Sequence, residues 1–513
     1  MKKWIALFMA LMMAVPLVAC KPSKPNNGPT ATDSGSNTTQ DPDPVGDPNS
    51  RENIKDDLPE LDFERAVLKI GYTLDAYDDR YGSIGSETGD DLVAYDIYKR
   101  NLYVEDRFNC LLNFVPFGES LATWESVNDI VYKQMLQGGE DCADVFMCTE
   151  HQLTASKIYN MFTDANNLEY VNLEKPYWWT NMMQECSLDG RTLPFLMGDI
   201  SMLNYLKAGV LYYNKNLFSR YYADQDPNTL YNMVLDGTWT IDALMEYTKD
   251  VYRDVNGNAE RDSGDLYGMI IGDGSAVWGG EYLRLMMGFD LELYSRKFDK
   301  KANMEIPVID MNNERVRNSI EKIHKLINLD GVFVDPNTTL DNNGRVHFAP
   351  DLALFFPGRF SAAQSGNFKD MESDYGVLIM PKYDLNQQNY KTYVADSCAT
   401  TALPTGKSRD TYRLASVVLE AMACYNYKVT AVTLLDKLLS TQYASDEITG
   451  QVVDLVAKTA TKNFVAENRG VTKDIIWTGF TASVTKNDFV VRYGARIDAA
   501  NEELRSYLID LYS

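Results

Sequence analysis

Histidine is scarce in this chain, and the few that occur are not arranged to hold a metal. The sequence has three, His151, His324 and His347, and none of them belongs to a spaced ligand motif. Cys142 and Cys148 are also separated by a spacing that is not a zinc pattern. The sequence therefore gives no reason to expect a zinc site.

Motifs of several common enzyme classes are also absent. No Gly-x-Ser-x-Gly, His-Glu-x-x-His or phosphate-binding glycine loop occurs in the chain. Carboxylates are abundant, however, and two acids at a suitable separation in a cleft can hydrolyse a glycoside. We predict that the protein is not an enzyme, and an exported glycan-active enzyme is the alternative.

The apolar run at the start of the chain, residues 4–19, is too short to span a membrane, since a span needs roughly 20 apolar residues with suitable flanks. It follows Lys2 and Lys3, which is typical of a secretory signal peptide covering residues 1–19. Its end, Leu17-Val18-Ala19-Cys20, resembles the bacterial lipobox. That resemblance implies that Cys20 is acylated, so that the exported protein is lipid-anchored to the cell membrane and faces outside the cytoplasm. An ordinary signal peptide followed by an incidental cysteine is the alternative.

Apolar residues are sparse again between residues 20 and 62, where Pro, Asn, Ser, Thr, Gly and Asp dominate. Such a segment cannot bury enough apolar surface to offset the entropy of ordering the chain. The sequence predicts a disordered tether behind the lipidated cysteine, and residues 63–513 then form the folded domain.

Basic residues are outnumbered by acidic ones, and the formal net charge is -24. Such an acidic surface argues against binding to nucleic acid and against peripheral binding to anionic lipid. We therefore expect the lipid on Cys20 to be the membrane link. Aromatic residues are plentiful, with 32 Tyr and 7 Trp, and their flat faces suit sugar rings, although most will be core. Six further cysteines permit disulfides, but their spacing does not resolve a pairing. They are Cys110, Cys142, Cys148, Cys186, Cys398 and Cys424.

Strand and helix patterns alternate along the first part of the folded region. Strands are expected at 66–72, 111–117 and 142–148, and helices at 95–108 and 124–136. This order predicts a parallel sheet covered by helices on both faces. Ligands bind such sheets at the loops after the carboxyl ends of the strands. Tyr77, Glu150 and His151 are therefore candidate ligand-binding residues, in positions shared with Asp75 and Glu119.

The same alternation returns later in the chain with insertions. Strands are expected at 209–214, 267–271, 353–356 and 375–380, and helices at 240–252 and 313–329. Thr240 is a suitable N-cap for the first of these helices. About 450 folded residues are too many for one ordinary domain. The sequence therefore predicts two α/β lobes.

Four stretches of sequence resemble the extracellular solute-binding protein family 1, the sugar-binding group that includes maltose-binding protein. Val210–Phe218 ends a strand in Tyr-Asn-Lys, and Gly237–Leu244 places Thr-Trp before an amphipathic helix. Leu354–Phe360 is similar to the family's segment that crosses the cleft, and Tyr375–Lys382 to its strand ending in a proline. The likeness covers most of the chain after the tether.

The resemblance implies an α/β, two-lobed, periplasmic-binding-protein-like fold with hinge-connected lobes. Lobe 1 would comprise residues 66–200 and 376–425, and lobe 2 residues 201–375 and 426–513, with hinges near Asp199–Tyr205 and near Met380. Such proteins close on a solute by hinge bending and present it to an ABC transporter permease. The implied partners are a carbohydrate ligand and a permease, with no required cofactor, and we expect a monomer. A sensory lipoprotein that presents its ligand to a receptor is a further alternative.

Further candidates for the ligand site come from the second half of the chain. Trp278 is flanked by glycines that would let a ligand approach, although a core tryptophan is equally consistent with the pattern. Glu281 follows closely, Arg359 ends a predicted strand and Asp396 lies beyond the predicted hinge. Such charged groups can bind sugar hydroxyls, and surface solvation is the alternative explanation. Of Trp178 and Trp179, one is expected to face solvent or ligand, and Trp239 to pack structurally.

An acidic segment at residues 254–265 resembles a calcium-binding loop, closer to that of dockerins than to the EF-hand. Oxygen-bearing side chains recur at the spacing that a hard cation needs, and the last of them is Asp and not Glu. Ala259 stands at the turn position where Gly is expected, which raises the backbone cost. A structural Ca²⁺ and a simple acidic loop are both open. The candidate ligands are Asp254, Asn256, Asn258, Glu260, Asp262 and Asp265.

Overall fold

The structure is a computed structural model. It describes residues 50–72, 79–116, 124–137, 142–153, 156–272, 280–301, 303–336, 344–364, 371–439, 447–468 and 488–512, together with 368, 472, 475, 476, 483, 484 and 486. The chain divides into two compact units, Met1–Pro48 and Asn49–Ser513. The first lies outside the described residues, as do the predicted signal peptide and Cys20. Within the described part, no helix is both long and apolar enough to cross a membrane.

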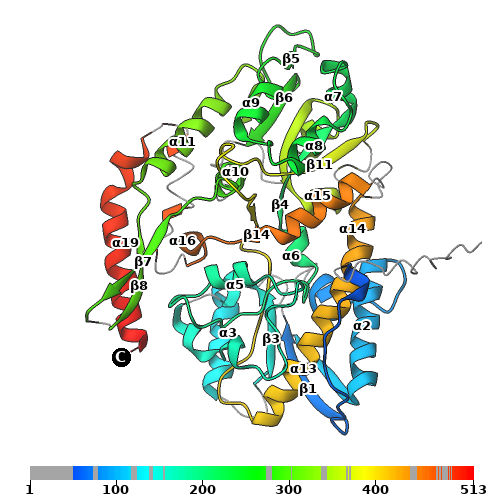
Figure 1. Cartoon of the computed structure of the whole chain (residues 1–513), viewed down its shortest axis with the longest axis vertical. Helices are drawn as coiled ribbons and strands as arrows, with labels where there is room; N and C mark the ends of the chain where they lie inside the picture. The colour runs from blue at the N-terminus through cyan, green and yellow to red at the C-terminus, as the bar shows by residue number, and fades with distance from the viewer. Residues whose placement is uncertain are drawn as a thin grey trace, which may run out of the picture. The chain divides into compact units, whose positions relative to one another are not determined.

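The first sheet contains the early strands of the chain. Its order is β13-β3-β1-β2, with bounds Ala399–Ala402, Val145–Thr149, Ala66–Tyr72 and Cys110–Pro116. β1 runs parallel to β2 and β3, while β13 is antiparallel to β3. Figure 1 shows α3 (Trp124–Gln137) and α2 (Leu92–Phe108) on opposite sides of these strands, with α13 (Arg409–Tyr425) beside α2. The predicted parallel sheet with helices on both faces is confirmed.

The second sheet has the order β11-β4-β10-β6-β5, and β9 also pairs with β6. β6, β9 and β10 are parallel, whereas β4 runs antiparallel to both β10 and β11. The antiparallel strands are placed differently in the two sheets: β13 lies at the edge of the first, whereas in the second β4 lies between β11 and β10 and β5 pairs antiparallel with β6 at the edge. The bounds are Tyr375–Ile379 for β11, Gly209–Asn214 for β4, Ala353–Arg359 for β10, Leu266–Gly272 for β6, Tyr252–Arg253 for β5 and Val332–Asp335 for β9.

Helix ends are set by side chains that accept hydrogen bonds from the first backbone N–H groups. Asp91 caps α2, Asn313 caps α11 (Glu314–Ile327) and Ser408 caps α13. Thr240 caps α9 (Ile241–Thr248), as predicted. Each cap satisfies a donor that the helix itself leaves unpaired, and is worth typically about 1 kcal/mol.

Shorter elements fill the first lobe and the junction between the lobes. The first lobe adds α4 (Glu150–Leu153), α5 (Thr180–Glu185) and short helical turns at Arg51–Asn53, Asp79–Ser83, Ser156–Met161 and Ala165–Asn167. α6 (Leu203–Leu206), α12 (Phe360–Gln364), the turn at Asn426–Thr430, α14 (Ala431–Leu439) and α15 (Glu447–Lys458) lie between the sheets or beside them.

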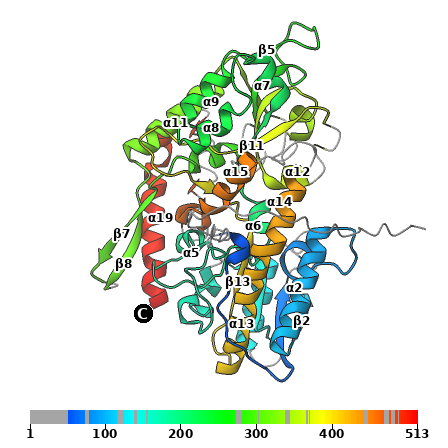
Figure 2. The same cartoon turned by 45° about the vertical axis from the view of Figure 1, so that its right-hand side comes forward.

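The second lobe adds α7 (Lys215–Tyr221), α8 (Thr229–Leu235), α10 (Gly280–Met287), a turn at Gly344–Phe348 and α16 (Phe464–Glu467). The two-stranded pair β12 (Thr392–Tyr393) and β14 (Ala460–Thr461) is parallel. A hairpin of β7 (Tyr294–Asp299) and β8 (Met304–Ile309) packs beside α19 (Phe489–Tyr512), where both cartoon views agree (Figures 1 and 2). Asn501 fixes this contact by bonding to both the N–H and the C=O of Ile309.

Two of the chain segments that connect the sheets pair with each other. Ala208 forms an antiparallel bridge with Val394, and the Ala395 N–H donates to the Lys207 carbonyl over 3.1 Å. The first crossing, at Lys207 and Ala208, lies just after the predicted Asp199–Tyr205 hinge. The second lies near residues 392–398, so the predicted hinge near Met380 is placed too early.

The predicted lobe boundaries need correction for a related reason. β11 pairs with β4 from Tyr375↔Asn214 to Ile379↔Val210, so residues 376–391 belong with the second lobe and not the first. Leu354–Phe360 does not cross between lobes either, because it forms β10 inside the second sheet. Both segments carry strand patterns, and the pattern alone does not say which sheet a strand joins.

The predicted tether also ends earlier than residue 62. The compact unit begins at Asn49, and Arg51 donates to the Tyr427 carbonyl and to the Asp454 carboxylate. The Phe63 N–H donates to the Phe108 carbonyl, and Ile54 and Leu58 pack against the core. A few apolar residues spaced along a polar segment are enough to attach it to a surface, although they cannot form a core of their own.

Candidate functional site

The topology places the candidate site at the carboxyl ends of the parallel strands, where α/β sheets bind ligands. Tyr77 and Trp278 follow β1 and β6 but lie outside the described residues. His151 belongs to α4, and its side chain is also outside what the structure describes. The predictions for these three residues stay predictions.

Glu150 is described, and it is not a solvent-facing carboxylate. It begins α4 directly after β3 and its side chain is 1 % exposed. Lys462 lies beside it, with Nζ 3.4 Å from the Glu150 carboxylate and 3.3 Å from that of Glu467. The same ammonium donates to the Ala395 carbonyl over 3.1 Å. The three side chains, here called the Lys462 cluster, thereby join the first sheet, the second crossing segment and the segment around β14 and α16.

Burial controls the ionisation of this cluster. It raises the pKa of Glu150 well above its ordinary value, against the attraction of Lys462, and Glu467 and Asp396 raise it further. Burial works against the charge of Lys462, but Cys398, Glu150 and Glu467 outweigh it and raise the pKa of Lys462. The cluster therefore holds a charged ammonium beside a carboxyl group that binds its proton more tightly than usual.

A further acidic side chain, Glu185, lies near the Lys462 cluster. Glu467 accepts a hydrogen bond from the Tyr393 hydroxyl over 3.0 Å, and Glu185 accepts one from the Phe464 N–H over 2.9 Å. Burial raises the pKa of Glu185. Glu150 Oε1 is buried with no hydrogen-bond partner in the structure.

The second sheet contributes its own charged residues near the crossing. Glu281 and Arg284 lie one turn apart on α10, and each is 3 % exposed. Glu281 accepts from the Gly272 N–H at the end of β6, and Arg284 donates to the Pro357 carbonyl over 3.4 Å. Arg359, half-buried at the end of β10, pairs in register with Gly209.

Gly209 shows how closely these groups approach the second crossing. A methyl group there would lie 3.1 Å from Arg284 Cδ and 3.3 Å from the Tyr393 carbonyl oxygen. Tyr393 in turn bonds Glu467, so the charged residues of α10 and the Lys462 cluster meet on either side of the segment 392–396. Asp396 is half-buried in that segment. Sequence reasoning selected Glu150, Glu281, Arg359 and Asp396, but missed Lys462, Glu467 and Arg284.

Three described tryptophans, Trp178, Trp179 and Trp239, are structural. Trp239 is fully buried, and its indole donates to the Ile379 carbonyl over 3.0 Å, as predicted. The prediction that Trp178 or Trp179 faces solvent or ligand is wrong, because they are only 4 % and 6 % exposed. Their indoles donate to Glu420 and Asp199, over 2.8 Å and 3.1 Å. Two buried carboxylates thus satisfy both indoles.

The six cysteines of the folded domain are buried free thiols, and none forms a disulfide. Burial raises the pKa of Cys398 to about 12 and that of Cys110 to about 11. Thiols of this kind are poor nucleophiles and behave as small apolar core residues.

The acidic loop 254–265 folds around its own side chains. Asp254 accepts from the Gly257 and Ala259 N–H groups, over 2.6 Å and 3.0 Å. Asp262 accepts from the side-chain amides of Asn256 and Asn258, over 3.0 Å and 2.6 Å. Across the described part of the chain, no three His, Cys, Asp or Glu side chains converge closely enough to hold a metal.

Two features of this loop match the predicted calcium pattern. Ala259 has φ +60°, the left-handed conformation that glycine adopts more readily. Asp265 is fully buried, and its Oδ1 has no hydrogen-bond partner, while Oδ2 accepts from the Tyr252 hydroxyl over 3.1 Å.

Comparisons with known proteins agree with this architecture. No family model and no curated protein sequence matches the chain. A cyclo/maltodextrin-binding protein complexed with maltotetraose is similar in structure, with TM-score 0.51, 12% identity and coverage of 87% of this chain and 97% of that one. The cyclic alpha-maltosyl-1,6-maltose binding protein of Arthrobacter globiformis has TM-score 0.51 and 10% identity, over 87% of this chain and 100% of that one.

UgpB from Mycobacterium tuberculosis, in complex with glycerophosphocholine, has TM-score 0.48 and 13% identity, over 83% of this chain and 98% of that one. At such identities the likeness concerns the fold alone. The matches span nearly all of each neighbour, and the two sheets with their paired crossings are present here. The chain therefore has the two-lobed, periplasmic-binding-protein-like α/β fold.

Proposed function

We propose that this protein is an exported, lipid-anchored solute-binding protein of family 1 that captures a carbohydrate between its lobes and delivers it to an ABC importer. The observation that carries the proposal is the pair of α/β sheets joined by crossing segments that pair through Ala208 and Val394. Such a connection allows lobes to rotate about a narrow strip of backbone. Similarly folded proteins include a maltodextrin-binding protein and a cyclic maltosyl-maltose-binding protein.

The charged groups near the crossing support a polyhydroxylated solute. Glu150 and Lys462 supply acceptors and a donor on one side of the segment 392–396, and Arg284 and Arg359 supply guanidinium groups on the other. Sugar hydroxyls both donate and accept, so they can match such mixed groups, with Trp278 as the stacking partner and Tyr77 as a further ligand-site residue that the sequence predicts.

Binding and closure test the proposal together. We expect one saccharide from a panel of mono- and oligosaccharides to raise the thermal midpoint of the mature protein, because a ligand specific for the folded state stabilises it by mass action. The same saccharide should reduce the radius of gyration in small-angle X-ray scattering. If no saccharide of the panel compacts the protein at a saturating concentration, capture between the lobes is contradicted.

The fate of the solute separates this proposal from a glycan-active enzyme. We expect the saccharide to be recovered unchanged after prolonged incubation, as chromatography of the supernatant would show. Hydrolysis products that increase with protein concentration would support the enzyme instead. A sensory lipoprotein would bind in the same way, so co-purification with a permease or with a receptor distinguishes those two.

The lipid anchor rests on the sequence Leu17-Val18-Ala19-Cys20. We expect Cys20→Ser to release the protein from the membrane fraction into the medium or periplasm, and mass spectrometry of the wild type to show an acylated Cys20 at the N-terminus. A wild-type protein that starts at another residue and carries no lipid would contradict this.

We also propose that the loop 254–265 binds a structural Ca²⁺. Its support is the recurrence of oxygen side chains, the left-handed Ala259 and the buried, unpartnered Oδ1 of Asp265. The side-chain nitrogens of Asn256 and Asn258 now donate to Asp262. Binding requires both amides to rotate so that their oxygens face the ion. Calorimetric titration with CaCl₂ should show one site that Asp254→Asn removes and Asp224→Asn, at an exposed position outside the loop, retains. Equal titration of the two variants would contradict the assignment.

A further inference from the structure

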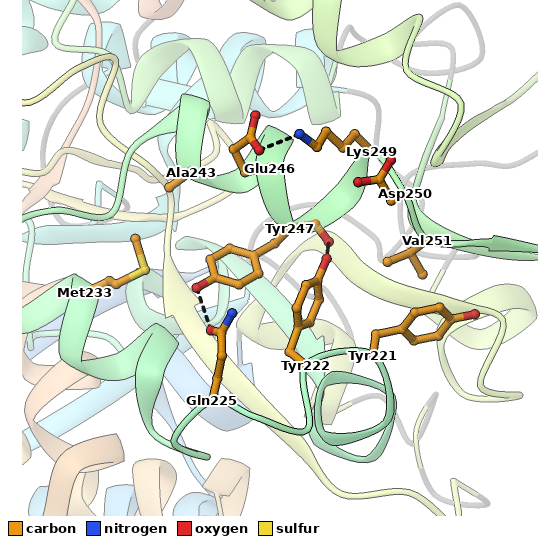
Figure 3. Close-up of a pocket in the computed structure, with 10 residues that line it drawn as sticks. All are labelled: Tyr221, Tyr222, Gln225, Met233, Ala243, Glu246, Tyr247, Lys249, Asp250 and Val251. Atoms are coloured by element: carbon orange, nitrogen blue, oxygen red, sulfur yellow. Dashed lines mark hydrogen bonds and ion pairs between the residues drawn. The ribbon is translucent and has the colours of Figure 1, made fainter.

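A pocket of about 680 Å³ lies on the second lobe, among α7, α8 and α9. Its volume falls within the range of small-molecule sites in proteins, roughly 300–1,000 Å³. Figure 3 shows the rings of Tyr247, Tyr222 and Tyr221 following one another across its wall. Met233 and Ala243 lie at one end. None of the lining residues belongs to the site near the crossing.

The tyrosine rings are held in place from inside the lobe. The Tyr222 hydroxyl donates to the Tyr247 carbonyl over 2.9 Å, and the Tyr247 hydroxyl donates to Gln225 over 2.8 Å. Their ring centroids are 5.0 Å apart in an edge-to-face arrangement, and both rings pack on Phe218. Burial raises the pKa of Tyr222 to about 12. With the two hydroxyls engaged, these residues offer mainly their rings to a ligand, and little entropy remains to be lost on binding.

Hydrogen-bond donors and acceptors both border the rings. Glu246 and Lys249 form an ion pair of 2.6 Å at the rim, and Asp250 lies beside them (Figure 3). Gln225 uses its oxygen to accept from Tyr247. Carboxylates accept hydrogen bonds and ammonium or amide groups donate them, so the rim can serve ligand groups that do both.

We propose that this pocket is a second carbohydrate-binding site, independent of lobe closure. A flat aromatic strip bordered by mixed donors and acceptors suits a sugar ring, which has an apolar face and a perimeter of hydroxyls. Since α7, α8 and α9 belong to one lobe, the pocket is complete whether the lobes are open or closed. It would let the protein hold one part of a glycan chain on its flank. The carbohydrate class rests partly on the proposed function, but the lining chemistry favours it separately.

Calorimetric titration of the mature protein with maltose, maltotetraose, cellobiose and xylobiose tests the site. Tyr221→Ala and Asp250→Asn should each weaken one binding component about tenfold or more, since a stacking face or a charged acceptor is lost. Matched controls outside the pocket, Tyr103→Ala and Asp224→Asn, should leave that component unchanged. The radius of gyration should not change as the component saturates, and crystals soaked in the saccharide should show it against Tyr221.

Three results would overturn the proposal. The first is that none of the four saccharides binds at millimolar concentration. The second is that a saccharide binds the pocket variants and the wild type equally well. The third is that tetramethylammonium binds there instead, which would make the pocket a cation site. Capture between the lobes is assessed separately by compaction, so either proposal can fail while the other stands.

Discussion

The Lys462 cluster and the acidic loop 254–265 use the same kinds of side chain in opposite surroundings. In the cluster, Glu150 is fully buried, and burial raises its pKa. In the loop, Asp262 is only half-buried, and the amide of Asn258 donates to its carboxylate and lowers its pKa. Surroundings, and not residue type, decide whether a carboxylate prefers its proton or its charge.

The two regions also differ in what they connect. Most hydrogen bonds of the loop stay within it and its flanks, and Arg261 adds one to the Asp330 carbonyl, so the loop has few links to the rest of its lobe. The Lys462 cluster joins residues about 300 positions apart in the chain, with Glu150 next to β3 and Lys462 next to β14. Damage to the cluster should therefore affect the whole fold, and damage to the loop should remain local.

The largest expected effect follows from removing the lysine. Lys462→Met should lower the free energy of unfolding by about 3–5 kcal/mol, because it leaves buried carboxyl groups without their cation. Urea denaturation at pH 8 measures this loss. The loss should be smaller at pH 5, where Glu150 can take up a proton. A loss below about 1 kcal/mol at pH 8 would mean that water reaches the cluster.

A smaller effect with a defined sign follows from Glu150→Gln. The folded-state pKa of Glu150 lies above its ordinary value of 4.5, so its contribution to stability is complete below that pH and declines as pH rises through the folded pKa. Gln cannot ionise, so the variant should gain stability relative to the wild type as pH increases from about 4.5. Denaturation midpoints across pH 4–9 test this.

Asp262→Asn is the matched control from the loop and should show the opposite slope. The pKa of Asp262 is lowered by hydrogen bonds to its charged form, so its contribution is present above the ordinary value of 3.8 and is lost as pH falls through the folded pKa. The variant should therefore be less stable than the wild type at neutral pH and should approach it in acid. Parallel slopes for the two variants would contradict the comparison.

Local patterns in the sequence predict the elements but not their partners. β1 and β4 have the predicted bounds, and α2 and α11 lie within a few residues of theirs, because apolar periodicity and caps such as Asn313 are local signals. The lobe predicted for β11 is wrong, because a buried strand of five residues has the same sequence pattern in either sheet. The β7–β8 hairpin was missed, because β7 (Tyr-Ser-Arg-Lys-Phe-Asp) is mostly polar and has no buried residue.

The candidate site shows the same difference between local patterns, which the sequence reveals, and long-range partners, which it does not. Glu150 directly follows β3 and Arg359 ends β10, so their place in the chain pointed to the site, and Glu281 was selected because it follows Trp278. Lys462 and Glu467 follow a two-residue strand whose partner lies in the crossing segment, and no periodicity marks such a pair. Trp178 and Trp179 show the reverse error: neighbouring aromatics suggest opposite faces, but an irregular backbone with Glu420 and Asp199 as acceptors buries both.

Backbone conformation in the loop gives a modest prediction. Ala259→Gly should raise stability by up to about 1 kcal/mol, because glycine adopts positive φ without the steric cost, and its greater freedom when unfolded limits the gain. Ala499→Gly, at an exposed position inside the helix α19, is the matched control and should cost about 1 kcal/mol. If Ala259→Gly destabilises as much as the helix control, the loop does not hold the left-handed turn.

The smallest effect should come from Lys249→Met, which repeats the Lys462 substitution at an exposed ion pair. The Lys249 ammonium is 2.6 Å from Glu246, closer than Lys462 is to either of its partners at 3.3 Å and 3.4 Å. Distance alone would make the exposed pair the stronger. Solvent screens it, however, and ordering two long side chains offsets much of the attraction. We expect the urea midpoint of Lys249→Met to match the wild type within error, while Lys462→Met unfolds far earlier. Similar losses in the two variants would mean that contact distance, and not burial, sets the strength of these ion pairs.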